Sequence, residues 1–272
     1  MKRTKAKPAG IAALGVDRGG TWTRVISIDI KLRPVKAVRF RTRPLKTLPA
    51  ALTARLARWP GAAAAPLVIA TRGAFSRAWK KDFLFRALSA KLNLVDVISD
   101  AEAAHYAAFG GKPGHLLIAG TGSVVFSGRP GAYKKTGGFN PRSGDPGSGR
   151  WLGRQYLKMR GRLKEAGAMS HGRSAAYAKK LLARAARGDR ACAVMAAAAQ
   201  HELAELLKSA AGGRGKIEAA LAGGLMDNEL FRTGFVRAAR RALAKRKLVL
   251  ARTGICAGEA AARLALQRKG NT

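Results

Sequence analysis

The residues best suited to chemistry in this 272-residue chain lie in short glycine-rich stretches that follow apolar runs. The clearest is Gly120-Thr121-Gly122-Ser123, which separates an apolar run at 116–119 from another at 124–126. Two such runs around a four-residue break predict a β-hairpin. Its glycines, its free N–H groups and the hydroxyls of Thr121 and Ser123 suit a bound phosphate. A tight turn without a ligand explains these four residues alone equally well.

A second strand–turn–strand pattern begins near the N-terminus, where an apolar run leads into Asp17-Arg18-Gly19-Gly20-Thr21. The two glycines permit a tight turn next to phosphate groups, and Thr21 offers a hydroxyl. The carboxylate of Asp17 could hold Mg²⁺ through water molecules, as this cation prefers oxygen ligands. The structural alternative is a hairpin in which Asp17 only favours the turn.

Asp100 stands between a strand-like run at 94–99 and a helical pattern at 101–109. Phosphoryl transfer from ATP to an alcohol needs a carboxylate that accepts the hydroxyl proton. An aspartate at the carboxyl end of a buried strand is well placed for that role. The alternative is a helix N-cap, for which aspartate is favoured, and both roles can hold at once.

Two further glycine-rich stretches follow in the second half of the chain. The segment 144–149, Gly-Asp-Pro-Gly-Ser-Gly, precedes a helical pattern, and such a loop can point N–H groups at an anion or a polar ligand. The alternative is a capped helix after a flexible loop. Gly223-Gly224 follows an apolar run, a weak signal by itself because glycine pairs are common in turns.

These stretches together resemble the N-acetylglucosamine kinase and BadF/BadG/BcrA/BcrD-type ATPase family, within the actin/hexokinase/chaperone ATPase superfamily. The resemblance covers about residues 11–265 and is most specific within 99–157, in SDAEAAHYAAFGGKPGHLLIAGTGSVVFSG and GGFNPRSGDPGSGRWLGRQYL. It implies an α/β protein with the two-lobed, ribonuclease H-like actin/hexokinase-type ATPase fold. Each lobe would hold a mixed sheet, with an inter-lobe nucleotide cleft.

The resemblance also implies an ATP-dependent, Mg²⁺-dependent sugar kinase acting on an amino sugar, N-acetylglucosamine or glucosamine. Asp100 would be the catalytic base, and Asp17 would bind Mg²⁺ through water. The remaining implied contacts are to the ATP phosphates (Gly19, Gly20, Thr21, Gly120, Thr121, Gly122, Ser123), to adenosine (Gly223, Gly224, Asn228) and to the sugar (Asp100, Gly122, Ser123, Asp145, Gly149).

Three positions depart from the family pattern. Arg18 replaces a usual glycine, Trp22 a lysine or serine, and Pro146 a glutamate. Two other functions therefore stay open: a BadF-type ATPase or activator without a sugar substrate, and a degenerate nucleotide- or nucleic-acid-binding protein. Characterised activators hold an iron–sulfur cluster with cysteines, and neither Cys192 nor Cys256 lies in a cluster pattern, which counts against the first.

The chain carries 52 basic and 15 acidic residues, a formal net charge of +37. Such a field attracts nucleic acid, but the basic residues are spread along the chain without interleaved aromatic residues. We therefore expect only non-specific contact with nucleic acid. No apolar run reaches the length of a membrane span, and two separate cysteines suit buried, reduced thiols, so we expect a cytoplasmic protein without membrane contact. A homodimer stays open.

The expected organisation is a disordered basic tail (1–10), an N-terminal lobe (11–110), a C-terminal lobe (111–255) and a final helix packing back across the lobes (256–272). Glycines and a proline at 110–114 predict the hinge. The apolar patterns predict strands at 11–16, 24–30, 35–40, 67–70, 94–99, 217–222 and 248–251, in addition to the hairpin, and helices at 49–58, 79–92, 101–109, 150–164, 175–186, 191–211, 228–244 and 257–267.

Overall fold

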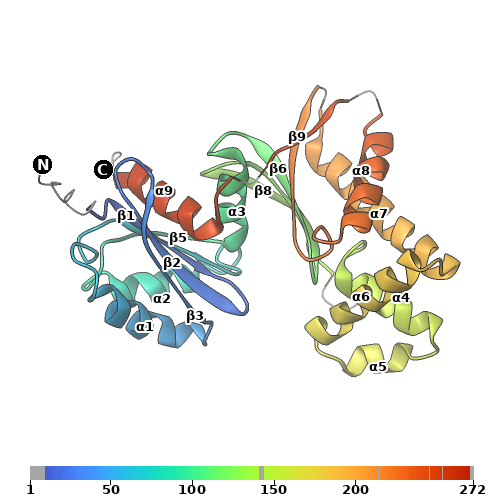
Figure 1. The fold of residues 1–272 in the computed structure, drawn as a ribbon, viewed down its shortest axis with the longest axis horizontal. Helices are drawn as coiled ribbons and strands as arrows, with labels where there is room; N and C mark the ends of the chain where they lie inside the picture. The colour runs from blue at the N-terminus through green and yellow to red at the C-terminus, as the bar shows by residue number, and fades with distance from the viewer. Residues whose placement is uncertain (1–9, 141–143, 214, 245, 253, 270–272) are drawn as a thin grey trace, which may run out of the picture. The chain divides into compact units, whose positions relative to one another are not determined.

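The computed structural model describes residues 10–140, 144–213, 215–244, 246–252 and 254–269. The expected basic tail lies outside these residues except for Gly10, which is exposed. The chain forms two compact units (Figure 1). The first contains the chain up to Gly110 together with the segment from residue 253 onward, and the second is the continuous segment Gly111–Arg252. The second boundary thus falls three residues before the expected one, at 252/253 instead of 255/256.

The first unit is built on a five-stranded mixed sheet with the strand order β3-β2-β1-β4-β5. β1 runs antiparallel to β2 and parallel to β4, and β5 extends the parallel part. The strands are β1 (Ala13–Arg18), β2 (Trp22–Ile28), β3 (Pro34–Arg41), β4 (Leu67–Thr71) and β5 (Leu94–Ile98). β3 is an edge strand, as its polar, proline-containing sequence predicts.

Helices cover both faces of this sheet, because its central strands are apolar on both sides. Leu67 and Ile69 of β4 pack toward α1 (Leu48–Leu56) and α2 (Trp79–Leu88). A short 3₁₀ turn, η1 (Leu45–Thr47), directly precedes α1. Val68 and Ala70 pack toward α3 (Asp100–Phe109) and α9 (Ala257–Lys269). The alternation follows from the two-residue period of a strand, and near-continuous apolar runs are typical of parallel strands buried on both faces.

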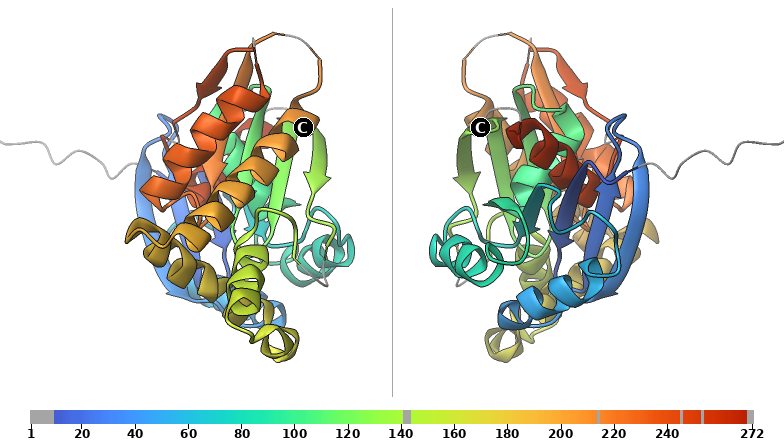
Figure 2. Two further views of the ribbon diagram at one scale, coloured as in Figure 1. Left: turned by 90° about the vertical axis from the view of Figure 1, so that its right-hand side faces the viewer. Right: turned by 90° about the vertical axis from the view of Figure 1, so that its left-hand side faces the viewer.

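The C-terminal helix α9 lies directly on β1 and β2 of this first unit (Figure 2, right). Gly15 of β1 makes the close approach feasible, because a Cβ there would stand 2.0 Å from the carbonyl oxygen of Gly258. Ala260, Ala261 and Ala262 are fully buried in the same contact. Small residues on both elements therefore let a helix backbone rest on a strand backbone.

The second unit contains another five-stranded mixed sheet, in the order β10-β9-β6-β7-β8. β6, β7 and β8 form an antiparallel meander, and β9 and β10 are parallel to β6. The strands are β6 (Gly114–Ala119), β7 (Ser123–Arg129), β8 (Ala132–Gly137), β9 (Ile217–Ala222) and β10 (Leu248–Leu250). The predicted hairpin is thus β6–β7.

One apolar core joins this sheet to its helices. Leu117, Val125 and Ile217 project from the sheet into a cluster with Leu203 and Phe235, all fully buried. Figure 2 (left) shows α7 and α8 on this face. The helices are α4 (Gly149–Met159), α5 (Leu163–Ala168), α6 (His171–Ala186), α7 (Arg190–Ala211) and α8 (Glu229–Ala242).

Three expectations from the sequence differ from the structure. β8 was not predicted, because its residues Tyr133, Lys134 and Lys135 carry no apolar alternation. The helix expected over 150–164 ends at Met159, and α5 begins separately at Leu163. Cys192 is buried as expected, but Cys256 is exposed. No described helix combines the length and apolarity that a membrane crossing would need.

Candidate functional site

The parallel strands of the first unit bring several predicted residues to one edge of the sheet. Asp17 of β1 pairs with Ala70 of β4, and Ala70 pairs with Ile98 of β5. Asp100 follows Ile98 by two residues. Carboxyl ends of parallel strands share an edge, so Asp17 and Asp100 lie at the same edge, where open α/β sheets commonly bind ligands.

Asp17 is the more enclosed of the two carboxylates, with 13% of its side chain exposed. Its Oδ2 accepts a hydrogen bond from Arg24 at 3.2 Å, and its Oδ1 has no partner among the described residues. Burial raises the pKa of Asp17 above its usual value. Arg24 opposes that shift, and the nearby charge of Asp100 adds to it. Asp17 and Asp100 are therefore close enough to influence each other.

Asp100 does not cap its helix, contrary to the structural alternative for this residue. The N-cap of α3 is Ser99, whose hydroxyl accepts from the Glu102 N–H at 3.1 Å. The Glu102 carboxylate returns the bond by accepting from the Ser99 N–H at 2.7 Å, which completes a capping box. The Asp100 carboxylate accepts only the N–H of Ala101, at 3.1 Å, among the described residues. The half-buried carboxylate keeps lone pairs for a ligand.

The β1–β2 turn closes with one hydrogen bond, from the Gly19 N–H to the Trp22 carbonyl at 3.1 Å. A Cβ at Gly20 would meet no atom within 4 Å, so packing does not require a glycine there. The unusual Arg18 leaves the turn intact because its guanidinium donates to the Arg43 carbonyl at 2.7 Å and to Thr71 Oγ1 at 3.4 Å. The turn backbone is therefore open to a ligand.

Lys80, which the motifs did not indicate, lies close enough to Asp100 for the two charges to interact. Lys80 donates to the carbonyl of Arg72 at 2.6 Å. Burial lowers the pKa of Lys80, followed by the charges of Arg77, Arg18 and Arg72, whereas the Asp100 carboxylate raises it. Lys80 therefore brings positive charge close to Asp100, with Arg18, Arg72 and Arg77 near Lys80, and such positive charge suits phosphate groups. Lys80, Arg72 and Arg77 could have been indicated from the sequence only by their position after β4 and near the start of α2, whereas Arg18 lies in the first glycine-rich motif.

In the second unit, the β6–β7 turn is braced by the start of α4. The Gly149 and Arg150 N–H groups donate to the carbonyls of Gly120 and Thr121, at 2.7 and 3.2 Å. The third N–H, of Trp151, donates to the N-cap hydroxyl of Ser148 at 3.2 Å. The prediction that this helix start points its N–H groups at a ligand is therefore wrong for these three groups. The Gly149 and Arg150 N–H groups hold the turn instead, and the Trp151 N–H is satisfied by the N-cap of its own helix.

Asp145 fixes the other side of the same turn. Its Oδ2 accepts from the Ser123 N–H at 3.3 Å and its Oδ1 accepts from the Asn140 N–H at 2.9 Å. The Ser123 hydroxyl donates to the Pro146 carbonyl at 2.8 Å. A Cβ on Gly122 would come within 2.7 Å of Asp145 Oδ2, which explains the glycine. Asp145 thus orders the turn and retains further lone pairs.

The glycine pair after β9 begins with Gly223, which lies against the end of β6. Gly223 has φ +94° and a Cβ there would stand 2.5 Å from the Ala119 carbonyl oxygen, so only glycine fits. At Gly224, by contrast, a Cβ would meet no atom within 4 Å. Asn228 caps α8 by accepting from the Phe231 N–H at 2.9 Å, which matches its predicted place at a helix start.

Ser123 and Asp145 also border a cavity of about 510 Å³. Its other polar lining residues include Asn140, Glu202 and Glu205, and Phe139 adds an exposed aromatic ring. Cavities of this size commonly hold small molecules. The two glutamates lie one helical turn apart on α7, and they match no motif that could have indicated them from the sequence.

Within each unit the structure therefore gathers the predicted residues at one edge. Asp17, the β1–β2 turn and Asp100 meet in the first unit, and 120–123, Asp145, Gly149 and 223–224 meet in the second. Among the described residues no group of three or more His, Cys, Asp or Glu side chains could hold a metal ion by itself. Mg²⁺ is commonly held by one or two carboxylates, waters and substrate phosphates, and Asp17 Oδ1 fits such a site.

Comparison with known proteins gives matches among solved structures. No protein-family model matches the chain, and no curated protein does. A proposed N-acetylglucosamine kinase from Chromobacterium violaceum aligns over 96% of this chain and 100% of its own, with TM-score 0.66 and 23% identity. The ROK hexokinase from Thermus thermophilus aligns over 94% of this chain and 99% of its own, with TM-score 0.64 and 21% identity. A ROK-family glucokinase from Streptomyces griseus, solved with glucose and AMPPNP, aligns over 95% of this chain and 100% of its own, with TM-score 0.56 and 19% identity.

At sequence identities this low, the structural alignments establish that the architecture is shared and nothing more specific. The two five-stranded mixed sheets, each with its own helices and its own glycine-containing hairpin turn, agree with these alignments over nearly the whole chain. The chain has the two-lobed α/β fold of the actin/hexokinase-type ATPases.

Proposed function

We propose that this protein is an ATP-dependent kinase that phosphorylates a hydroxyl group of a sugar, most specifically an amino sugar such as N-acetylglucosamine or glucosamine. The observation that carries the proposal is the Asp100 carboxylate. Ser99 and Glu102 cap α3 without it, so Asp100 stays available beside Asp17 at the carboxyl edge of the sheet. Solved structures of the same fold support the substrate class, since they include a proposed N-acetylglucosamine kinase and a glucokinase with bound glucose and AMPPNP.

In the proposed reaction the sugar hydroxyl oxygen attacks the γ-phosphorus of ATP. The new oxygen–phosphorus bond forms while the bond to the bridging β,γ-oxygen breaks, and ADP leaves. Asp100 accepts the hydroxyl proton as the bond forms. The Gly19–Thr21 and Gly120–Ser123 turns bind phosphates through the hydroxyls of Thr21 and Thr121 and the N–H groups of Gly20 and Gly122. The Gly19 N–H and both the N–H and the hydroxyl of Ser123 donate within the protein instead. Asp145 and Gly149 order the second turn, and Asp145 also accepts hydrogen bonds from the sugar.

We further propose that Mg²⁺ accompanies ATP and is held by Asp17 through water molecules. When bound, the cation neutralises phosphate charge. Gly223, Gly224 and Asn228 lie beside the adenosine. Glycine without a Cβ lets the flat base approach the backbone at Gly224, where packing leaves the space open. The two free cysteines are consistent with a reducing, cytoplasmic location.

The test is ADP release from ATP and Mg²⁺ in the presence of a panel of amino sugars and hexoses. The wild type should release ADP when one class of sugar is added. Asp100→Asn should lower kcat by about 10²- to 10⁴-fold, the usual contribution of a general base. ADP release at the same rate with and without each sugar would support the ATPase alternative. No ADP release under any condition would support the degenerate binding protein.

A further inference from the structure

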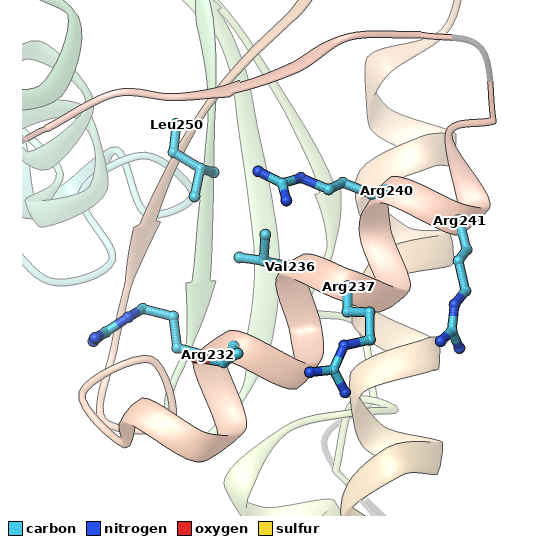
Figure 3. A pocket seen from close by; sticks show the side chains of 7 residues that line it. Arg232, Val236, Arg237, Arg240, Arg241 and Leu250 are labelled. Atoms are coloured by element: carbon cyan, nitrogen blue, oxygen red, sulfur yellow. The ribbon is translucent and has the colours of Figure 1, made fainter.

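A hollow of about 570 Å³ lies between α8 and the edge strand β10 in the second unit. Figure 3 shows its floor, formed by Val236 and Leu250, with Arg240 reaching across toward Leu250. The lining residues are Arg232, Thr233, Val236, Arg237, Arg240, Arg241 and Leu250. We call this hollow the arginine groove. These described lining residues include no acid and none of the residues assigned above to ATP or sugar.

Three of the four arginines make no interaction with the described part of the protein. Arg232 donates to the Met226 carbonyl at 2.9 Å. Arg237, Arg240 and Arg241 have neither a hydrogen bond nor an ion pair with any described residue, and all three are exposed. Elsewhere on the surface, arginines do find acids, as Arg162 does with Glu165 and Arg184 with Asp189. The groove therefore concentrates positive charge that nothing in the described protein balances.

The amphipathic character of α8 explains why these side chains face outward. Phe231, Phe235 and Ala239 occupy the buried face of the helix, one turn apart. A solvated basic face would follow from that pattern alone, and this chain is basic throughout. A merely solvated face needs no hollow, however, and here the cations surround a depression whose floor is apolar.

We propose that the arginine groove binds the phosphate backbone of a nucleic acid. Guanidinium groups bind phosphates through two parallel hydrogen bonds, and arginine favours such contacts over lysine. From Arg232 to Arg241 the helix rises about 13 Å, at 1.5 Å per residue, which suits successive phosphates of a strand better than one phosphate group. The described lining of the groove offers no aromatic ring on which a base could stack. Recognition therefore goes to the backbone and is independent of base sequence.

The test compares two triple variants that each remove three positive charges from the second unit. One is Arg237→Gln, Arg240→Gln, Arg241→Gln in the groove. The matched control is Arg173→Gln, Lys179→Gln, Arg187→Gln on and just after α6, where all three residues are exposed. Binding of a labelled, mixed-sequence 20-base-pair DNA duplex is measured by fluorescence anisotropy from 50 to 300 mM NaCl, with circular dichroism and thermal melting to establish that each variant is folded.

For backbone contacts, log K falls with log salt by about 0.9 per phosphate neutralised. The groove variant should therefore lower the magnitude of the salt slope by about 2 to 3 and weaken binding about tenfold or more at 0.15 M salt. The α6 control should change the slope by less than about 1. Equal losses in both variants, or no binding by the wild type, would overturn the proposal. So would a groove variant that loses only inorganic polyphosphate binding, measured in competition, while its DNA binding is unchanged.

Discussion

Ser99 and Asp100 are adjacent but do different work at the start of α3. The Ser99 hydroxyl and the Glu102 carboxylate satisfy the helix N-terminus reciprocally, while the Asp100 carboxylate accepts only the next N–H among the described residues. We therefore expect Ser99→Ala to lower the free energy of unfolding by about 1 kcal/mol, as loss of a cap usually does. This corresponds to a drop in Tm of about 2–4 °C for a protein of this size.

Asp100→Asn should leave Tm within about 1 °C of the wild type, since its carboxylate makes only a local hydrogen bond within the described part of the chain and substitutions away from packed or paired positions rarely change stability much. Its effect should fall on catalysis alone. Thermal melting of both variants beside their ADP-release rates separates the two roles. A large loss of stability in Asp100→Asn would show that this carboxylate supports the helix after all.

Asp17 should make stability depend on pH in an unusual direction. Burial raises its pKa in the folded protein above the unfolded value of about 3.8. The folded state therefore holds the proton more tightly, and this contribution is fully present below the unfolded pKa and lost as pH rises through the folded pKa. Asp17→Asn should raise Tm at pH 7 and leave it unchanged near pH 3. A lower Tm at pH 7 would show that the ion pair with Arg24 outweighs the cost of burial.

At the scale of the elements, the glycines of the second unit fall into two kinds. Gly149 and Gly223 are required by packing, because a Cβ would stand 2.8 Å from the Gly120 carbonyl oxygen and 2.5 Å from the Ala119 carbonyl oxygen. Gly224 has free space around it. Gly149→Ala should therefore destabilise the protein by about 1–3 kcal/mol, the usual cost of overpacking.

Gly224→Ala should leave Tm almost unchanged but raise the KM for ATP, because we place adenine against this backbone. Steady-state kinetics at varied ATP, with melting curves of both variants, makes the comparison. A Gly224→Ala enzyme with unaltered KM for ATP would remove this residue from the nucleotide site.

Most elements could be predicted from the sequence because their apolar periods are strong. The buried run Leu67–Thr71 and the hairpin around Gly120 and Gly122 are found where the pattern places them. β8 could not be predicted, since its pairing with β7 comes from the meander rather than from its polar side chains. The break between α4 and α5 could not be predicted either, because the sequence between Met159 and Leu163 contains no proline.

The candidate site was predictable in its residue types but less so in its roles. An aspartate before a helical pattern, such as Asp100, suggests a helix N-cap, but only the structure shows that Ser99 is the N-cap of α3. Asp145 and Gly149 matched a motif, yet Asp145 Oδ2 and the Gly149 N–H bond to the β6–β7 turn, a contact between segments more than 20 residues apart. Lys80, near Asp100, and the neighbouring Arg72 and Arg77 belong to no motif that could have indicated them.

At the scale of the whole molecule, charge dominates. With 52 basic and 15 acidic residues, most basic side chains have no acidic partner, and the net charge of +37 works against compaction. We expect Tm to rise as NaCl increases from 20 to 300 mM, because the Debye length shortens and repulsion weakens. Differential scanning calorimetry at fixed pH measures this. A falling Tm would mean that ion pairs such as Arg184–Asp189 contribute more than the repulsion costs.

The most direct test of the central claim is to identify the reaction product. Wild type and Asp100→Asn are incubated with ATP, Mg²⁺ and each sugar of the panel, and the reaction is followed by mass spectrometry for a sugar whose mass has increased by one phosphoryl group. The wild type should convert at least one amino sugar to its phosphate in a 1:1 ratio with ADP, and Asp100→Asn should form it at least about a hundred times more slowly. ADP formed without any phosphorylated sugar, or equal rates in the two proteins, would contradict the proposal that Asp100 activates a sugar hydroxyl.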